Sequence, residues 1–130
     1  MAQSDDGWFT GRLFAYHLSN GGESALQVHY AHLYNIDNRF SIGVGYGCIF
    51  DSGINIPLEA ETRVYLLRNS RLRMPLLVSG GYVFGYGVAT ISPRIGIEAG
   101  KHTRFRFAAD AGCAVLGDVC VLRLGAGVVF

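Results

Sequence analysis

Three side chains close to residue 20 have the types that nucleophilic acyl chemistry requires. His17 can act as a general base, Ser19 as the nucleophile that the base activates, and Glu23 as the acid of the set. Such a set would catalyse acyl transfer or deacylation. The alternative is that the three are ordinary polar residues around a turn, and we favour it because nothing in the sequence fixes their relative geometry.

Glu59 and Glu61 form a second chemical pairing. Lying two positions apart, they share one face of a strand, and paired carboxylates can divide acid and base work between them. Arg63 continues the same face. We therefore favour ion pairing between these carboxylates and arginines over a catalytic role.

Residues that commonly bind metals are present but poorly spaced. His29 and His32 are three positions apart, so they point to opposite faces of a strand, and we expect His29 among the inward-facing polar groups. Cys48, Cys113 and Cys120 form no metal-ligand pattern. Cys113 and Cys120 can either form a cross-strand disulfide or remain two small free thiols. We expect no metal and no cofactor.

Composition limits the class of protein. The 130 residues form one domain; 50% are hydrophobic and 16% are charged, against roughly 25% charged residues in ordinary soluble domains. No run of about 20 apolar residues is present, which excludes a transmembrane helix. The net charge of +1 provides no basic patch, so we expect no nucleic-acid partner. The first six residues lack the pattern of an export signal, and a mature or recombinant chain is expected.

The elements that must position these side chains are predicted to be strands. Apolar and polar residues alternate with a period of two along almost the entire chain, interrupted by short segments rich in Gly, Asn, Asp and Ser. The predicted strands are residues 8–18, 25–36, 40–50, 55–67, 72–85, 89–99, 103–115 and 119–130. Eight antiparallel strands with short links can close on themselves, so we predict an all-β, up-and-down barrel. The three prolines are expected near strand ends.

The two faces of the predicted strands differ in kind. One face carries large apolar side chains such as Ile56 and Leu58, whereas the other carries glycine, alanine and charged residues. Small and charged residues suit the narrow lumen of an eight-stranded barrel, and the large apolar face suits lipid. The reverse orientation would give a soluble barrel with an apolar, ligand-binding interior. The predicted lumenal charges are Arg12, Glu59, Glu61, Arg63, Arg73, Arg94, Glu98, Arg104, Arg106, Asp110 and Arg123.

Aromatic residues are predicted to cluster at both ends of the barrel, as they do at the two interfaces of membrane barrels. The first rim is assigned Trp8, Phe9, Tyr34, Phe40, Phe105, Phe107 and Phe130. The second rim is assigned Tyr46, Phe50, Tyr82, Phe84 and Tyr86.

A family resemblance rests on the segments FSIGVGYG (40–47), IPLEAETRVYLL (56–67), GGYVFG (80–85) and ISPRIGIE (91–98), together with the terminal Phe130. In these features the chain resembles the small eight-stranded outer-membrane β-barrels of Gram-negative bacteria. The resemblance implies an outer-membrane location, contact with outer-membrane lipid, and recognition of Gly125, Val128 and Phe130 by the barrel-assembly machinery.

The function expected from this resemblance is structural or accessory. The lumen would be salt-bridged and too full for a large pore, and the barrel would stand alone or dock against a larger outer-membrane complex. Some barrels of this kind are lipid-modifying enzymes, and this is the setting in which His17, Ser19 and Glu23 would act. The remaining alternative is the soluble ligand-binding barrel.

Overall fold

The computed structural model describes residues 9–37, 39–51, 53–68, 71–100 and 106–130. This described part contains eight strands: β1 (Phe9–Asn20), β2 (Glu23–Asn35), β3 (Phe40–Phe50), β4 (Ile54–Arg68), β5 (Leu72–Phe84), β6 (Val88–Ala99), β7 (Arg106–Leu116) and β8 (Val119–Val129). Each strand overlaps one predicted segment, with ends that differ by a few residues. Among the described residues, no helix has the length and apolar character needed to cross a membrane.

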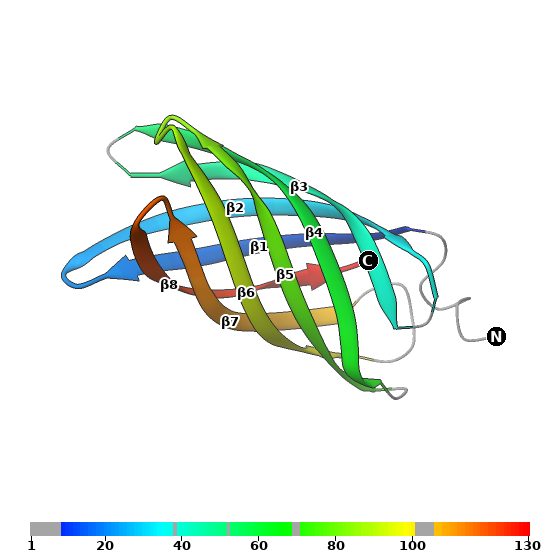
Figure 1. Cartoon of the computed structure of the whole chain (residues 1–130). Coiled ribbons are helices and arrows are strands. Elements are labelled where there is room, and N and C mark those ends of the chain that lie inside the picture. Colours follow the sequence, from blue (N-terminus) through cyan, green and yellow to red (C-terminus); the bar gives the residue numbers. More distant parts are fainter. Residues whose placement is uncertain (1–8, 38, 52, 69–70, 101–105) are drawn as a thin grey trace.

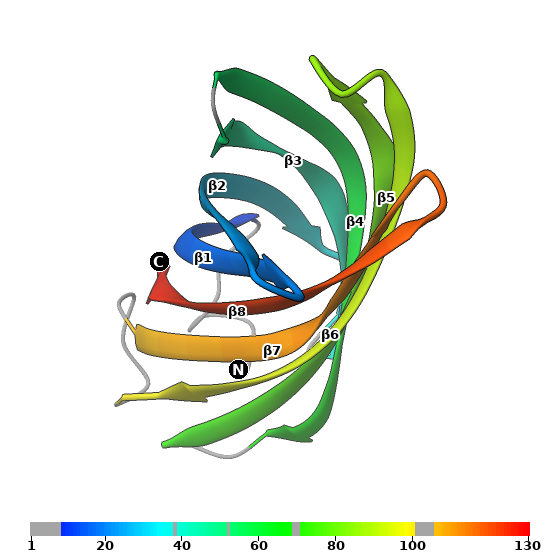
Figure 2. The ribbon, with the colours of Figure 1, turned by 90° about the vertical axis from the view of Figure 1, so that its left-hand side faces the viewer.

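The eight strands form one closed antiparallel barrel in which each strand pairs with its neighbours in the chain. The ring closes where β1 pairs with β8, with Leu13 opposite Val128 and Tyr16 opposite Gly125. Figure 1 shows the start of β1 and the end of β8 at the same end of the barrel, which we call the terminal end, and Figure 2 shows the strands running around its circumference. The predicted all-β, up-and-down barrel is confirmed.

Tight turns connect strands at the end of the barrel opposite this terminal end. The β1–β2 turn has only two residues between its strands, and its Gly21 has a φ of 64°. The β7–β8 turn is built in the same way around Gly117, with a φ of 65°. The first residue of a two-residue hairpin turn commonly has a positive φ of this kind, and glycine adopts it most readily. These turns fix the register of the strands on either side.

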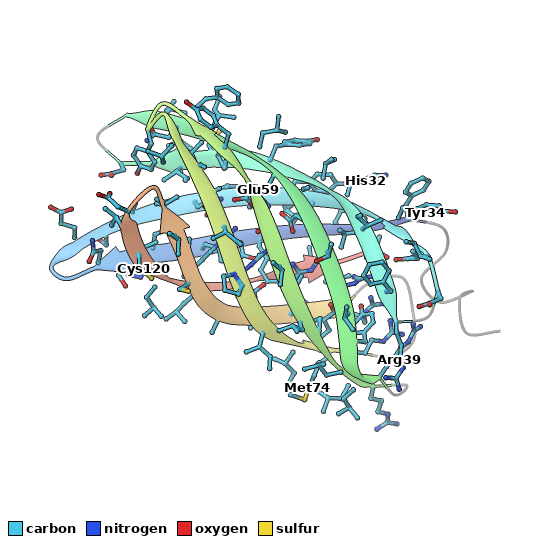
Figure 3. The ribbon with its side chains drawn as sticks, in the orientation of Figure 1. His32, Tyr34, Arg39, Glu59, Met74 and Cys120 are labelled. Atoms are coloured by element: carbon cyan, nitrogen blue, oxygen red, sulfur yellow. The ribbon has the colours of Figure 1, made fainter. Side chains whose placement is uncertain are left out.

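The period-two pattern separates the side chains into a lumen and an outer wall. Along β4, Glu59 and Glu61 are 4% and 1% exposed, whereas Leu58 between Pro57 and Glu59 is 49% exposed. In Figure 3, the labelled Glu59 lies within the barrel while Met74 and Tyr34 project from it. The charged face therefore lines the lumen, and the large apolar face forms the outer wall.

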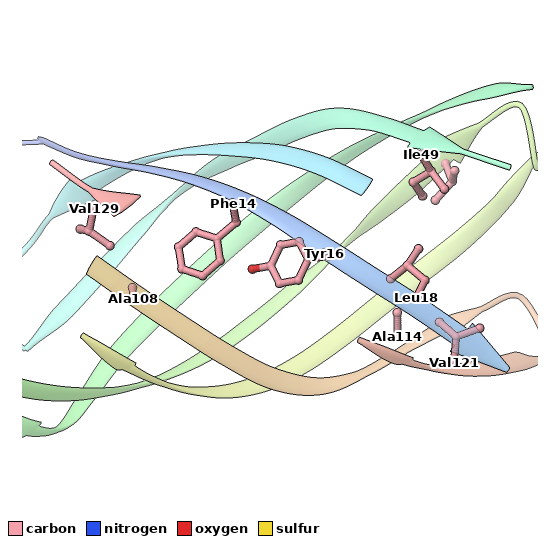
Figure 4. Close-up of a cluster of buried hydrophobic side chains, with 9 residues drawn as sticks. Phe14, Tyr16, Leu18, Ile49, Ala108, Ala114, Val121 and Val129 are labelled. Carbon is pink, nitrogen blue, oxygen red and sulfur yellow. The ribbon is translucent and has the colours of Figure 1, made fainter. Parts of the chain in front are cut away.

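The lumen also contains an apolar cluster. Phe14, Tyr16 and Leu18 of β1 point inward, where they pack with buried side chains of other strands (Figure 4). The buried members contributed by the other strands are Ile49, Val83, Ala108, Ala114, Val121 and Val129. The interior is thus a mixture of ionic and apolar contacts and is less uniformly polar than the sequence pattern predicted.

Proline positions differ in part from the prediction. Pro57 and Pro75 lie near the beginnings of β4 and β5, but Pro93 lies in the middle of β6, opposite Val78. The prediction that all three lie near strand ends was therefore wrong for Pro93. Pro75 lies opposite Tyr65, next to a register shift that marks a β-bulge in β4.

Ser92 explains why β6 accepts a proline at its centre. The β6–β7 register pairs Ile91 with Val115 and Arg94 with Gly112, and its continuation puts Pro93 opposite Cys113. Proline has no N–H to donate to the Cys113 carbonyl. The Ser92 hydroxyl donates to that carbonyl instead, at 2.8 Å, and its oxygen accepts a hydrogen bond from Arg123 at 2.9 Å. A lumenal side chain thus replaces the backbone hydrogen bond that the proline cannot form.

Candidate functional site

The buried charges of the lumen form the densest group of ionisable side chains in the described structure. Six arginines and four carboxylates are each less than 6% exposed. They are Arg12, Arg63, Arg73, Arg94, Arg106 and Arg123, with Glu59, Glu61, Glu98 and Asp110. These are the predicted lumenal residues apart from Arg104, which lies outside the described residues.

Asp110 of β7 is the centre of the first group of contacts. Arg12 Nη2 lies 3.2 Å from Asp110 Oδ2, and the Tyr16 hydroxyl donates to the same oxygen at 2.9 Å. Arg94 donates to the Tyr16 hydroxyl at 2.6 Å. Arg123 stacks on the Tyr16 ring at 4.1 Å from its centroid. One carboxylate and one phenol thereby hold together side chains from β1, β6 and β8.

A second group lies around Glu98 of β6. Arg106 Nε donates to Glu98 Oε1 at 3.2 Å, and the Tyr65 hydroxyl donates to the same oxygen at 2.8 Å. Nearby, Arg63 donates to neutral oxygens, those of Asn35 at 3.1 Å and Ser41 at 3.0 Å. Some lumenal arginines therefore bond to carboxylates, whereas others donate to neutral oxygens.

A third group joins His29 of β2 to Glu59 and Glu61 of β4. His29 Nε2 is hydrogen bonded to Glu61 and lies 3.8 Å from Glu59 Oε1. Arg94 Nη2 donates to the other Glu61 oxygen at 3.4 Å. One ligand atom from each of the three residues lies within 4.8 Å of the other two. Sequence reasoning placed His29 in the lumen but missed this convergence, because it depends on the β2–β3–β4 register.

A hollow of about 280 Å³ opens at the end of the barrel opposite the terminal end, and we call it the mouth pocket. Its floor contains Leu18 and Val121, which belong to the apolar lumenal cluster. Its rim carries the carboxylates of Glu23, Asp51 and Asp118. The pocket therefore combines an apolar floor with an acidic rim.

Tyr86 links two turns across this mouth. Its hydroxyl donates to Asp51 Oδ2 at 2.9 Å, joining the β5–β6 turn to the β3–β4 turn. Partial burial, and secondarily the hydrogen bond to Asp51, raise the pKa of Tyr86 to about 12. Sequence reasoning assigned Tyr86 to an aromatic rim and missed its hydrogen bond.

The predicted acyl-transfer residues do not share one surface. Ser19 and Glu23 line the mouth pocket, whereas His17 is exposed on the outer wall, opposite Leu26 and Leu124. Among the described contacts, no hydrogen bond joins any two of these residues. The arrangement brings a serine and a carboxylate to the mouth without placing the proposed base beside them.

The C-terminal residues close the barrel. Phe130 exchanges two backbone hydrogen bonds with Gly11 of β1, at 2.7 and 2.9 Å, and its ring contacts Tyr30 with centroids 6.4 Å apart. Gly125 faces the Tyr16 ring so closely that a side chain there would collide with it. The three residues predicted as an assembly signal thus border the β1–β8 seam. Recognition of these residues by the barrel-assembly machinery remains a prediction.

Cys113 of β7 and Cys120 of β8 lie in thiol–thiol contact beside the last turn, and both are free thiols. Figure 3 shows Cys120 near the end of the barrel opposite the terminal end. The two cysteines are close, but Cys113 lies opposite Leu122 and Cys120 opposite Val115, so they are diagonal neighbours and do not directly face one another, as a cross-strand pair would. The outcome under oxidation stays a prediction.

Aromatic side chains on the outer wall gather near the terminal end. Phe9 contacts Tyr34 and His32, with centroid distances of 5.5 and 4.7 Å. Tyr30 continues the group toward Tyr46, at 5.8 Å, so Tyr46 lies between the rims rather than at the second one. Trp8 and Phe105 lie outside the described residues. At the opposite end Tyr82 packs edge-on against Phe84 at 5.0 Å.

Comparison with known proteins identifies solved structures that share this fold. No protein-family model matches the sequence, and no curated protein sequence matches it significantly. A de novo designed transmembrane β-barrel superimposes with a TM-score of 0.70 at 13% identity, covering 93% of this chain and 93% of that one.

Natural barrels superimpose nearly as well. Neisserial surface protein A gives a TM-score of 0.62 at 13% identity, over 93% of this chain and 94% of that one. The N-terminal β-barrel domain of OprF from Pseudomonas aeruginosa gives 0.61 at 12% identity, over 93% and 96%. Identities this low establish a common fold and carry no activity from one protein to another. The chain has the fold of the small eight-stranded outer-membrane β-barrels that its sequence resembles.

Proposed function

We propose that this protein is an integral outer-membrane barrel with a structural or accessory role. The observation that carries the proposal is the inverted distribution of its side chains. Leucine, isoleucine, valine and phenylalanine are exposed on the outer wall, while arginine, glutamate and aspartate are buried in the lumen. A soluble protein buries the first set and exposes the second.

The positions of the outward charges support lipid contact. Within the described strands, only Glu23 at the start of β2 and Arg68 at the end of β4 carry an outward or half-exposed charge. A charge on the lipid face near the membrane midplane costs roughly 2–4 kcal/mol, and the cost falls toward the interfaces. The central part of the described wall is free of that cost.

The aromatic residues of the wall support two interfaces. Phe9, Tyr34 and Phe130 are exposed near the terminal end, and Tyr82 and Phe84 are exposed toward the opposite end. Amphipathic rings at both boundaries are typical of membrane barrels. With the terminal end facing the periplasm, the mouth pocket would face outward.

The lumen favours a structural role over conduction. Large buried side chains cross it at several levels, with Arg12 and Phe14 stacked at 4.2 Å and Arg94 joined to Tyr16 and Glu61. An eight-stranded barrel has an interior just wide enough for its own side chains. We therefore expect little or no ion conductance.

Docking to other molecules would use the wall or the mouth. The β1–β2 and β7–β8 turns have two residues each, so they offer little surface for recognition by loops. Outer-membrane lipid is the primary partner in this proposal, and a larger membrane complex against the wall is the second. A lipid-modifying activity is less favoured, because His17 lies on the wall outside the mouth pocket.

Recognition by the barrel-assembly machinery is tested through Phe130, which is 47% exposed. A Phe130→Ser variant should insert poorly into outer membranes in cells. Phe107→Ser is the matched control, because Phe107 is a wall phenylalanine that is 69% exposed and lies one strand away. Equal insertion of both variants would remove the assembly role of the terminal residue.

Folding with and without detergent tests the membrane proposal itself. The denatured chain is diluted either into detergent micelles or into plain buffer. We expect a β-rich, protease-resistant species that migrates differently after heating, and we expect it only with detergent. A monodisperse folded monomer in plain buffer would contradict the proposal. Large, stable conductance steps in planar bilayers would contradict the filled lumen.

A further inference from the structure

We propose that His29, Glu59 and Glu61 form a binding site for one divalent transition-metal ion, with zinc as the type case, inside the lumen. Imidazole nitrogen and carboxylate oxygen are both zinc ligands. Their ligand atoms converge to within 4.8 Å of one another, and all three side chains are at most 4% exposed. The proposal does not depend on whether the outer wall contacts lipid.

The strand register brings these residues together across a glycine. His29 lies on β2 and both glutamates lie on β4, so β3 separates them. Gly45 of β3 is the residue between them, paired with Ala31 on one side and with Glu59 on the other. A Cβ at residue 45 would collide with His29 Nε2 and with Glu61 Oε2. Glycine therefore keeps open the space in which the ligand atoms meet.

Glu59 supplies independent evidence for a missing positive partner. Its Oε1 atom is buried and accepts no hydrogen bond. Among the described buried carboxylates, Glu61, Glu98 and Asp110 each form an ion pair with an arginine, and Glu59 forms none. Its ion-pair contact in the described structure is with His29, 3.8 Å away, whereas Arg94 and Arg123 act on it only from a longer distance. A buried carboxylate in this condition is costly unless a cation accompanies it.

One separation already suits a small ion, whereas His29 Nε2 and Glu61 are in direct hydrogen-bond contact and would have to move apart to share that ion. Zinc bonds of 2.0–2.2 Å in tetrahedral geometry place pairs of ligand atoms about 3.4 Å apart. The separation of 3.8 Å between His29 Nε2 and Glu59 Oε1 is close to this value. Three protein ligands leave the fourth position for water. Calcium and magnesium fit less well, because both prefer oxygen and the site presents an imidazole nitrogen.

Neighbouring side chains would orient the ligands. Gln27 Nε2 lies 3.3 Å from His29 Nδ1, and Arg94 donates to the Glu61 oxygen that faces away from His29. If His29 Nε2 binds metal, Nδ1 keeps its proton and donates a hydrogen bond to the Gln27 side-chain oxygen, after the Gln27 amide has rotated. Gln27 is thus a positioning residue, and metal sites of this kind lose about 10–100-fold in affinity when such a residue is removed.

The competing occupant is a proton. A positively charged His29 could bridge the two glutamates without any metal, and it would use the same three side chains. The two possibilities differ in one observable property, because only the first gives a barrel that retains a stoichiometric metal ion.

Metal retention is measured on tag-free protein folded into detergent. Zinc is present during folding, because the site is enclosed, and excess ion is removed by gel filtration before elemental analysis. We expect one zinc per barrel in the wild type and less than a tenth of that in His29→Gln and Glu59→Gln. His32→Gln is the matched control, because His32 lies on the same strand but is exposed on the outer wall. It should retain zinc like the wild type.

Cobalt provides the second measurement. Co²⁺ loaded in the same way should show the visible absorption of a tetrahedral site, and Gln27→Ala should weaken retention during dialysis against a chelator. The proposal is overturned if the folded wild type retains no metal. It is also overturned if His29→Gln and Glu59→Gln, shown to be folded by heat-modifiable migration, retain as much as His32→Gln.

Discussion

Ser92→Ala should destabilise the barrel far more than the loss of one surface hydroxyl would. Ser92 is completely buried, and its hydroxyl donates to the Cys113 carbonyl, to which Pro93 cannot donate a hydrogen bond. Alanine leaves that carbonyl without a donor inside the sheet. It also removes the oxygen to which Arg123 donates.

The expected cost follows from these two lost contacts. A buried carbonyl left unsatisfied costs about 1–3 kcal/mol, and loss of a hydrogen bond from a charged donor costs a comparable amount. We therefore expect Ser92→Ala to lower the free energy of unfolding by about 2–4 kcal/mol. Most single substitutions cost less than this.

A double-mutant cycle isolates the carbonyl contribution. Pro93→Val restores an N–H opposite Cys113, and Pro93 is exposed on the wall, where valine is compatible with its surroundings. In the Pro93→Val background, Ser92→Ala should cost about 1–2 kcal/mol less than in the wild type. Ser79→Ala is the control, because Ser79 is a buried serine that accepts from Arg94 and lies beside Ser92. Its cost should be equal in both backgrounds.

The assay is equilibrium unfolding in urea in the presence of detergent, followed by heat-modifiable migration and circular dichroism together. Coincident transitions from the two probes justify a two-state free energy. An equal cost of Ser92→Ala in both backgrounds would refute the argument that the serine replaces the proline N–H.

Three further predictions concern the wall, the mouth and the cysteines. Val44→Arg, near the middle of β3, should lower the free energy of unfolding by about 2–4 kcal/mol. Ile54→Arg, at the start of β4, should lower it by at most about 1 kcal/mol. Equal costs of the two variants in urea unfolding would argue against a lipid-facing belt. The raised pKa of Tyr86 stabilises the fold fully below pH 10, the usual pKa of tyrosine, and this contribution is lost as the pH rises to about 12. Stability of the wild type should therefore fall more steeply than that of Tyr86→Phe across this interval, and parallel curves would contradict the pKa shift. A mild oxidant should link Cys113 to Cys120 within one chain, which a non-reducing peptide map detects, and recovery of only unlinked thiols would show that their contact is unsuited to a bridge.

The sequence was sufficient to predict the barrel because the signal is repeated in every strand. Glu59 and Glu61 alternate with Leu58 and Ala60, and the same contrast between charged or small and large apolar residues recurs along the chain. Turn segments containing Gly21 or Gly117 mark the strand boundaries, since only a few residues adopt their backbone conformation readily. Alternation and turns together determine strand number and the two faces.

Contacts across the lumen could not be predicted in the same way. That His29 meets Glu61 follows from the register of three strands and from the absence of a side chain at Gly45, and one sequence does not specify that register. The predicted position of Pro93 near a strand end was wrong for a related reason. Its tolerance in a central position depends on Ser92, whose hydroxyl reaches the neighbouring strand only in the folded barrel.

The apolar part of the lumen was also missed. Phe14 and Leu18 have the same parity as Arg12 and therefore point inward with it, but charged residues dominated the interpretation of that face. In the structure these side chains fill the space between the ionic groups. Glycines beside these side chains help to make room for them, such as Gly45 next to His29 and Gly125 next to Tyr16.

Quenching of a wall tryptophan by brominated lipid tests the central claim most directly, because it asks whether the apolar face touches the membrane interior. Trp8 is replaced by phenylalanine and Val44, which is 50% exposed on the wall, by tryptophan. The barrel is then folded into vesicles of brominated or ordinary lipid. We expect strong quenching by the brominated chains and little quenching by aqueous iodide. Quenching by iodide alone would contradict the account.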